Sequence, residues 1–356
     1  MNLKSLIFAV LTAFLVLVMN SSSVAVNTKD IDIVRKKGVL ESQDLKIIDI
    51  FVSEAVQELV KTRDFTSIAK VRTEILSRQS AQGQYAQQFS QSAYKYISAG
   101  LAQAQTLEPE DRKTKVIVNL LILIDGLRDL RLADLAIKML RNENMIVRYW
   151  AVHCLTTPEI IKQLNSSEGS SSKPAEVITA EFKKLVESSS PEIIALMAQF
   201  SADVKIPQGE ELLGQIADMR IKQYADWTVK YELIDVTILK LLDSKIPLPS
   251  EGAGGAPAET SSGKAAIARR FGQLYSYAIQ RYTKGQAFLN ETQKQQLVSI
   301  LVETEEKCIG RLLGRPQTTI RRAIERENLQ ALLQEHNRLL GDETQAGELP
   351  LRLNFD

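Results

Sequence analysis

The chain has 356 residues, of which 44 are basic and 43 acidic, so its formal net charge is +1. This balance excludes an overall electrostatic attraction to nucleic acid or to an anionic membrane, and partners must be selected by local surface. Glycine (17 residues) and proline (10 residues) are scarce for this length, and both destabilise helix interiors. The composition therefore favours an all-α protein.

The first residues have the pattern of an export signal. Lys4 precedes the apolar stretch 6–19, and Ser23-Val24-Ala25 offers the small side chains that a signal peptidase requires. As a helix, this stretch would span about 21 Å, less than the ~30 Å hydrocarbon core of a bilayer. We expect residues 1–25 to be a cleaved signal peptide and the mature protein to be periplasmic or extracellular, without membrane insertion. An uncleaved membrane anchor is the alternative.

Three helices are predicted between residues 42 and 101, because apolar residues recur there at helical spacing. The connections between them are short, which predicts antiparallel neighbours. The expected stripes are Phe51, Ala55, Val56, Leu59 and Val60; Phe65, Ile68, Ala69, Arg72, Ile75 and Leu76; and Tyr85, Phe89, Ala93, Tyr96 and Ile97.

The next segment contains a helical pair that recurs along the chain. Ile178 follows Leu132 by 46 residues and Ile194 follows Val147 by 47, and a weaker third copy follows. Two-helix units at this period indicate stacked α-solenoid repeats. The three pairs of stripes are Leu132, Ala136, Leu140 with Val147, Trp150, Ala151, Cys154, Leu155; Ile178, Phe182, Val186 with Ile194, Met197, Ala198, Ser201, Ala202; and Leu213, Ile216, Ala217 with Ile234, Thr237, Ile238, Leu241, Leu242.

Residues 140–155 resemble the turn and second helix of a HEAT repeat. The matching positions are Val147 and Arg148 after the turn, followed by Ala151 and Leu155 on the buried stripe, with Trp150 between them. The resemblance implies an α-α superhelix of stacked helical hairpins, in which Arg148 contacts the preceding turn and aligns neighbouring repeats. The turn lacks the family's common aspartate, and the second copy has Ala195 in place of the arginine.

Composition divides the rest of the chain. We expect a repeat domain over 26–243, a flexible linker over 244–264, where glycine, serine and proline gather, a C-terminal helical bundle or cap over 265–341, and a tail over 342–356. Three helices are predicted in the cap. One is lined by Phe271, Leu274, Tyr275, Ala278 and Tyr282, one begins at Asn290 with Gln293 in capping-box spacing, and one covers 316–340.

Catalytic, metal and cofactor sites are not indicated by the pattern of reactive side chains. The two histidines, His153 and His336, lack the helical spacing that binds zinc. Cys154 is adjacent to His153, so the two side chains diverge by about 100° around a helix and form no thiol–imidazole pair. Cys154 and Cys308 are expected as buried thiols, and a disulfide between them is the alternative in an oxidising compartment.

A cluster of arginines around the start of the last predicted helix could bind an anionic partner. The cluster comprises Arg311, Arg315, Arg321, Arg322 and Arg326. The competing interpretation pairs these arginines with Glu303, Glu305 and Glu306 of the preceding helix. Base-stacking aromatics are not indicated near them, which argues against nucleic acid as the partner.

Together these patterns favour an exported, non-enzymatic scaffold that binds another protein, of the cell envelope, through a helical-repeat surface. The alternative is an enzyme acting on envelope polysaccharide, with a site assembled across helices from acidic and aromatic residues. The residues considered for it are Asp218, Tyr224, Asp226, Trp227 and Tyr231, and Trp227 is expected to lie in the core instead.

Overall fold

The computed structural model describes residues 28–80, 83–166, 173–247, 262–342, 344–353 and 355. Every regular element within these ranges is helical, apart from one isolated bridge between Gly341 and Ala346, so the prediction of an all-α protein is confirmed. The expected signal peptide and residues 248–261 of the expected linker lie outside the described ranges. The chain forms two compact units, 1–135 and 136–356, and each is described by itself.

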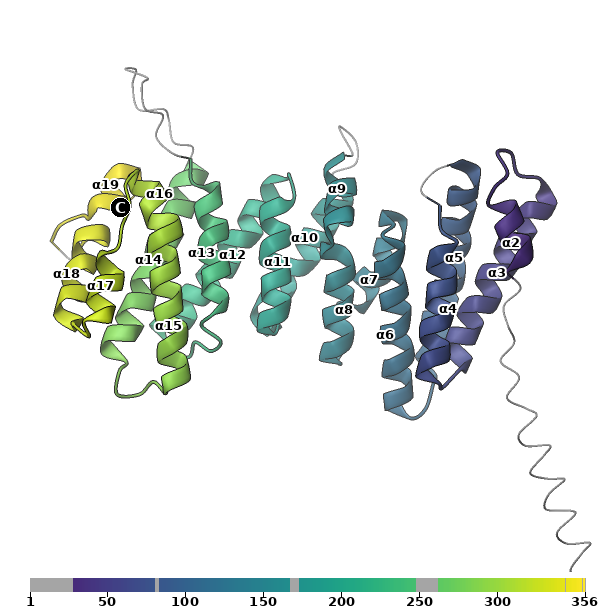
Figure 1. Cartoon of the computed structure of the whole chain (residues 1–356), viewed down its shortest axis with the longest axis horizontal. Coiled ribbons are helices and arrows are strands. Elements are labelled where there is room, and N and C mark those ends of the chain that lie inside the picture. Colours follow the sequence, from purple (N-terminus) through teal and green to yellow (C-terminus); the bar gives the residue numbers. More distant parts are fainter. Residues whose placement is uncertain are drawn as a thin grey trace, which may run out of the picture. The chain divides into compact units, whose positions relative to one another are not determined.

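The first unit is built around the antiparallel helices predicted between residues 42 and 101. Helix α3 packs against α5, and α4 and α6 contact both each other and α3 (Figure 1). The side chain of Asp64 accepts a hydrogen bond from the amide of Ser67 and so fixes the start of α4. The helices are α2 (Lys29–Val34), α3 (Ser42–Lys61), α4 (Phe65–Ser77), α5 (Gly83–Ala104) and α6 (Glu110–Leu127), followed by a 3₁₀ turn (Leu130–Leu132).

The stripe predicted for α4 is partly wrong. Ile68 and Ile75 are buried as expected, and Val71 completes their row. Phe65 is 64% exposed and Ala69 is also exposed. Phe65 is the first residue of α4, so its side chain lies beyond the turns of the helix that pack on the core.

The second unit begins within α7 (Ala133–Met139) and contains the remaining helices. They are α8 (Met145–Thr156), α9 (Pro158–Ser166), α10 (Lys173–Leu185), α11 (Pro191–Asp203), α12 (Pro207–Ala225), α13 (Ile234–Lys245), α14 (Ser262–Lys284), α15 (Glu291–Thr304), α16 (Gly310–Leu313), α17 (Thr319–Glu325), α18 (Leu329–Leu340) and α19 (Glu348–Leu353). A π-helical turn (Glu305–Ile309) lies between α15 and α16.

Two rows of helices follow from the contacts inside this unit. Helix α8 contacts α11, α11 contacts α13, and α13 contacts α15, while α10 contacts α12, α12 contacts α14, and α14 contacts α18 (Figure 1). The rows are joined because α12 also contacts both α11 and α13. Each helix therefore covers the apolar stripe of its neighbours along and across the rows.

The predicted repeat stripes supply most of this core. All residues of the three first-helix stripes are buried, as are Val147, Ala151, Cys154 and Leu155 on α8. Trp150 is only half-buried and lies against the rings of Tyr149 and His153. Arg148 donates from Nη1 to the carbonyl oxygens of Asn142 and Glu143, at 2.8 and 2.9 Å, which places it against the preceding turn.

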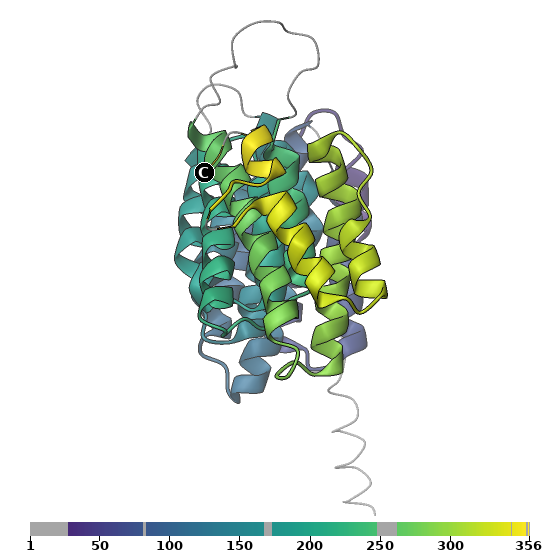
Figure 2. The same cartoon turned by 90° about the vertical axis from the view of Figure 1, so that its left-hand side faces the viewer.

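The C-terminal helices agree with the prediction at the start of α15 and differ from it over residues 316–340. The capping box between Asn290 and Gln293 is present at the start of α15. The single helix expected over 316–340 is wrong, because Glu327 has a left-handed backbone (φ 51°) and the side chain of Asn328 caps the amide of Ala331. These features end α17 and start α18. Figure 2 shows the last helices, in yellow, beside α14, in green.

The segment 342–356, expected only as a tail, contains α19. Leu349 of this helix is fully buried and Leu353 nearly so, and α19 contacts α14, α16 and α18. Within the described residues, no helix combines the length and apolar character needed to cross a membrane.

Candidate functional site

The loop of residues 226–233, between α12 and α13, holds two exposed aromatic residues in an uncommon backbone conformation. Trp227 has φ 56° and Tyr231 has φ 54°, in the left-handed region that bulky residues seldom adopt. They are 49% and 64% exposed, so the expectation that Trp227 is a core residue is wrong. Such backbone costs on the order of 1–3 kcal/mol per residue and persists where surrounding contacts enforce it.

The end of α12 explains the conformation of Trp227. The amide of Trp227 donates to the carbonyl of Tyr224 at 3.1 Å, and the amide of Thr228 donates to the carbonyl of Gln223 at 2.9 Å. This pair of hydrogen bonds defines a Schellman motif, in which the residue after the C-cap is usually glycine. Here that position is a tryptophan, and its side chain projects from the helix end.

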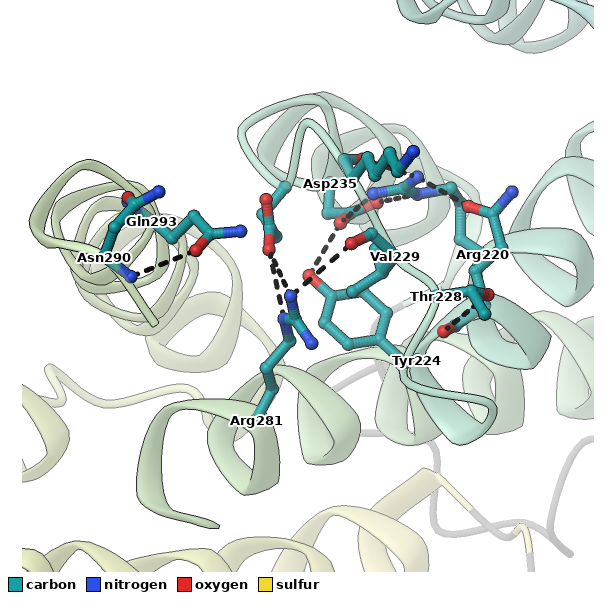
Figure 3. A network of polar contacts seen from close by, with 11 residues as sticks. Arg220, Tyr224, Thr228, Val229, Asp235, Arg281, Asn290 and Gln293 are labelled. Carbon is teal, nitrogen blue, oxygen red and sulfur yellow. Dashed lines mark hydrogen bonds and ion pairs between the residues drawn. The ribbon is translucent and has the colours of Figure 1, made fainter. Parts of the chain in front are cut away.

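A buried ion pair below the loop joins α12 to α13. Arg220 donates from Nε and Nη2 to the two carboxylate oxygens of Asp235, at 2.7 and 2.8 Å, and the side chains are 7% and 0% exposed. The hydroxyl of Tyr224 donates to the same carboxylate at 2.8 Å, and Nη1 of Arg220 donates to the carbonyl of Lys230 at 3.1 Å. Figure 3 shows these contacts converging on Asp235.

The pKa shifts in this group reflect its burial. Burial raises the pKa of Asp235, and the hydrogen bonds from Arg220 oppose the rise. The pKa of Tyr224 lies well above its ordinary value, because its hydroxyl is buried next to the Asp235 carboxylate. For Arg220, burial lowers the pKa, but the hydrogen bonds to Asp235 and the negative charge of that carboxylate together outweigh it, so the pKa is raised. Arg220 is therefore charged and committed to Asp235.

A second buried ion pair ties the same loop to α14. Arg281 contacts the carboxylate of Glu232 at 2.9 Å from Nη2, and Glu232 is almost completely buried. Nη2 of Arg281 also points to the carbonyl of Val229, at 3.5 Å (Figure 3). The guanidinium carbon lies 5.8 Å from the centre of the Trp227 ring, within the range of a cation–π contact. Loop 226–233 is thus fixed from both sides.

A cavity of about 460 Å³ lies next to Trp227, at the turn between α14 and α15. Its lining comprises Trp227, Arg281, Lys284, Gly285, Phe288 and Leu289. Phe288 is 86% exposed. Gly285 lets the two segments approach, because a Cβ there would lie 3.2 Å from the Trp227 ring and 2.4 Å from the carbonyl oxygen of Arg281. A smaller cavity of about 180 Å³ lies beside Tyr231 and Lys230.

We refer to Trp227, Tyr231, Phe288 and these two cavities as the aromatic loop site. Both cavities border loop 226–233, and the polar groups nearest the loop are already bonded within the protein. The arrangement presents aromatic rings and lysine side chains on a rigid support. It can bind a ligand by stacking and charge.

The five residues considered for a polysaccharide-acting enzyme lie on α12 and in the loop that follows it. Asp218 is bonded to Arg270 at 2.7 Å, Tyr224 is buried, and Asp226 is exposed. Two other carboxylates of this region, Glu232 in the loop and Asp235 at the start of α13, are buried and each bonded to an arginine. A carboxylate in that state is unsuited to attack a substrate or to donate a proton to it.

The arginine cluster is largely engaged in ion pairs, but mostly not with the expected partners. Arg311 bonds to Asp243 at 2.7 Å and Arg315 to Glu348 at 2.5 Å. Only Arg321 meets one of the expected glutamates, Glu306, at 2.6 Å. The two remaining members of the cluster, Arg322 and Arg326, are exposed.

The other two expected glutamates have different contacts. Glu303 bonds to Lys240 at 2.8 Å. Glu305 is fully buried in the π-helical turn and accepts hydrogen bonds from the amides of Ile320 and Arg321, at 2.7 and 2.8 Å. Glu305 therefore caps the start of α17 instead of neutralising an arginine.

The two histidines contact neighbouring polar or aromatic side chains, and the two cysteines are buried. Nε2 of His336 lies 2.7 Å from the hydroxyl of Ser276, and Nδ1 lies 2.8 Å from the side-chain oxygen of Asn337. His153 lies against the ring of Trp150, at 5.2 Å between centroids. Cys154 and Cys308 are buried and are not joined by a disulfide, and burial raises the pKa of Cys308 to about 12.

In the part of the chain that the structure describes, no group of three or more histidine, cysteine, aspartate or glutamate side chains could hold a metal ion.

Comparison of the chain with protein-family models, with curated proteins and with solved structures gives no match in any of the three cases.

The sequence suggested Trp227 and Tyr231 only as parts of a possible enzyme site, and it predicted neither the exposure of Trp227 nor the part played by Phe288. The available signal is the stretch "YADWTVKYELID", residues 224–235, in which aromatic residues stand outside the helical stripes on both sides of a break. The exposure of the rings depends on two ion pairs that fix the loop. Arg220 and its partner Asp235 are 15 residues apart in the sequence, and Arg281 and its partner Glu232 are 49 residues apart.

Proposed function

We propose that this protein is an exported binding protein without catalytic activity. In this proposal it is a HEAT-like α-solenoid that holds another protein of the cell envelope, and the aromatic loop site is its principal contact. The observation that carries the proposal is the exposure of Trp227 and Tyr231 on strained backbone above two buried ion pairs.

The helical arrangement supports the solenoid part of the proposal. Successive helices in each row of the second unit contact one another, which is the packing that stacked helical hairpins require. The buried stripes recur from α7–α8 to α10–α11 and α12–α13. Arg148 bonds to the turn before its helix, as the resemblance to HEAT repeats implies.

Loop 226–233 and the ion pairs beneath it carry features that lower the stability of the fold. Two aromatic residues held in left-handed backbone lower stability, and so does the burial of ions. The same segment would be more stable with glycine at Trp227, because the Schellman position favours it. Exposed tryptophan and tyrosine on rigid backbone are the residues that contribute most to protein interfaces. A binding role accounts for both the rings and their support.

The absence of catalysis is proposed because the best-placed nucleophile and base act as a structural link. Ser276 of α14 and His336 of α18 lie 2.7 Å apart, but the Ser276 hydroxyl also accepts a hydrogen bond from Gln280 at 3.1 Å. An activated serine would be labelled covalently by a fluorophosphonate probe. We expect no labelling of the purified protein, and labelling that disappears in Ser276→Ala would refute this part.

Site-specific photo-crosslinking tests the binding role. A benzoylphenylalanine is placed at Tyr231 in cells that produce the protein, and a matched variant carries it at Phe65 of α4, which is equally exposed at 64%. We expect the Tyr231 position to give a discrete crosslinked protein that the Phe65 position does not give. Equal products at both positions, or none at Tyr231, would contradict the proposed site.

A further inference from the structure

We infer that the aromatic loop site takes an acidic protein segment that carries a large apolar side chain. This inference rests on the proposed function and names the chemistry of the partner. Two features of the site carry it, the shape and lining of the larger cavity and the sign of the charge around it.

The larger cavity is suited to one bulky apolar group. Trp227 and Phe288 form aromatic walls, and Leu289, only 8% exposed, contributes apolar surface deeper down. Its volume of about 460 Å³ falls in the range of cavities that enclose ligands. Because Phe288 is 86% exposed, covering it with an apolar group would remove a large apolar area from water.

The charge beside this cavity is positive. Arg281 is neutralised by Glu232, but Lys284 donates only to the neutral side-chain oxygen of Gln280, at 3.1 Å. Within the described part of the chain, no acidic group lies within 4.0 Å of the Lys284 ammonium. A carboxylate next to the apolar group of the partner would therefore meet an uncompensated cation.

The smaller cavity has a mixed lining. Lys230 and Tyr231 lie there with the exposed Glu187. Asp226, the exposed acid that precedes Trp227, lines neither cavity. The Glu187 carboxylate disfavours anions at the smaller cavity. The acidic residue of the partner is therefore assigned to Lys284, beside the larger cavity, and Tyr231 is left to contact apolar or uncharged groups.

Intrinsic fluorescence offers a direct test, because the chain has two tryptophans. In Trp150→Phe, Trp227 is the sole tryptophan and reports occupancy of the site. The probes are three blocked pentapeptides: Asp-Glu-Phe-Glu-Asp, the same peptide with lysine in place of each acid, and the same peptide with alanine in place of phenylalanine. We expect a saturable change in emission with the first peptide and binding at least about tenfold weaker with the other two.

Variants of Lys284 and Phe288 test whether the change in Trp227 emission reports binding through these two residues. Lys284→Glu should weaken binding of the acidic peptide about tenfold, through repulsion in place of attraction, and Phe288→Ala should weaken it by a similar factor. The matched controls are Lys70→Glu and Phe65→Ala, exposed residues of α4, which should leave binding within about twofold of the Trp150→Phe protein.

The inference would be overturned by the lack of a saturable response to the acidic peptide up to about 1 mM, a concentration that detects even weak binding. A response that Lys284→Glu leaves unchanged would overturn it too. Tighter binding of a chitin hexasaccharide than of the peptide would also overturn it, in favour of a carbohydrate ligand. If Tyr231 still crosslinks to a protein in cells while the peptide fails, the proposed function stands and only the partner's chemistry is wrong.

Discussion

The guanidinium of Arg220 and the carboxylate of Asp235 form a bidentate ion pair, at 2.7 and 2.8 Å, in which neither side chain is more than 7% exposed. This geometry joins the last turns of α12 to the first turn of α13 and fixes the loop between them. Because both ions are buried, removal of one leaves the other uncompensated.

We therefore predict that Asp235→Asn destabilises the protein by about 3–5 kcal/mol. The double variant Arg220→Met/Asp235→Leu should lose less than Asp235→Asn, because it leaves no buried charge. Urea unfolding followed by circular dichroism measures both. The control is Asp218→Asn, whose exposed pair with Arg270 (52% and 30%) should contribute no more than about 1 kcal/mol. A double variant that is less stable to urea than Asp235→Asn would argue against the electrostatic explanation.

At Trp227 we expect glycine to be more stable than alanine, which is the reverse of the order inside a helix. At this left-handed position, Trp227→Gly should be more stable than Trp227→Ala by about 1 kcal/mol, since glycine adopts positive φ without strain. At Leu333, an exposed residue within α18, the glycine variant should be less stable than the alanine variant by a similar amount. Thermal melting of the four variants tests the difference. If alanine is the more stable at both positions, Trp227 is unstrained.

Glu305 should be among the most sensitive residues of the C-terminal helices. Its buried carboxylate accepts two backbone hydrogen bonds at the start of α17, and bonds to a charged group contribute about 1.5–3 kcal/mol each. Glu305→Ala should cost about 3 kcal/mol or more, and Glu305→Gln less, because the amide oxygen still accepts. Urea unfolding compares them with Glu306→Ala, whose partner Arg321 is 39% exposed. Equal losses for Glu305→Ala and Glu306→Ala would contradict the capping role.

Glu181 gives a dependence on pH. The ammonium of Lys184, at 2.6 Å, and then the guanidinium of Arg141, at 2.8 Å, lower the pKa of Glu181 from its ordinary value of 4.5. A lowered pKa in the folded state means that the stabilisation is complete above the ordinary pKa and is lost as the pH falls through the lower folded value. It should amount to about 0.3–1 kcal/mol.

The variant Glu181→Gln removes this contribution. The difference in unfolding free energy between the parent and Glu181→Gln should be largest near about pH 6 and disappear towards about pH 2. Glu291→Gln is the control, because Glu291 is 81% exposed and its ion pair with Lys294 lies within one helix. A difference that is constant across this pH range would show that the effect is not one of ionisation.

The helical fold could be predicted because its signals are local. The stripes of α8, α10 and α11 follow from spacing alone, and the capping box at Asn290 follows from two residues three apart. The break between α17 and α18 was missed, because Glu327 adopts a left-handed conformation that favours glycine or asparagine. Phe65 was misplaced because periodicity does not reveal whether a neighbouring helix reaches the first turn.

The candidate site was less accessible to prediction, because it depends on pairs that are distant in the sequence. Arg281 and Glu232 are 49 residues apart. Phe288, in the turn between α14 and α15, lines the same cavity as Trp227, which lies in the loop between α12 and α13. A tryptophan between two amphipathic helices is usually read as core. Trp227 is exposed because it occupies the left-handed position of a Schellman motif. That motif is usually recognised in a sequence by its glycine, which is absent here.

The cap of α17 also bears on the order in which the chain folds. The carboxylate that receives the first amides of this helix lies 15 residues earlier, in the π-helical turn after α15. Helix α17 has seven residues, which is too short to be stable in isolation. It is therefore expected to form after α15 and to be lost with it. The amides of Ile320 and Arg321 should exchange with deuterium only through openings that also release α15.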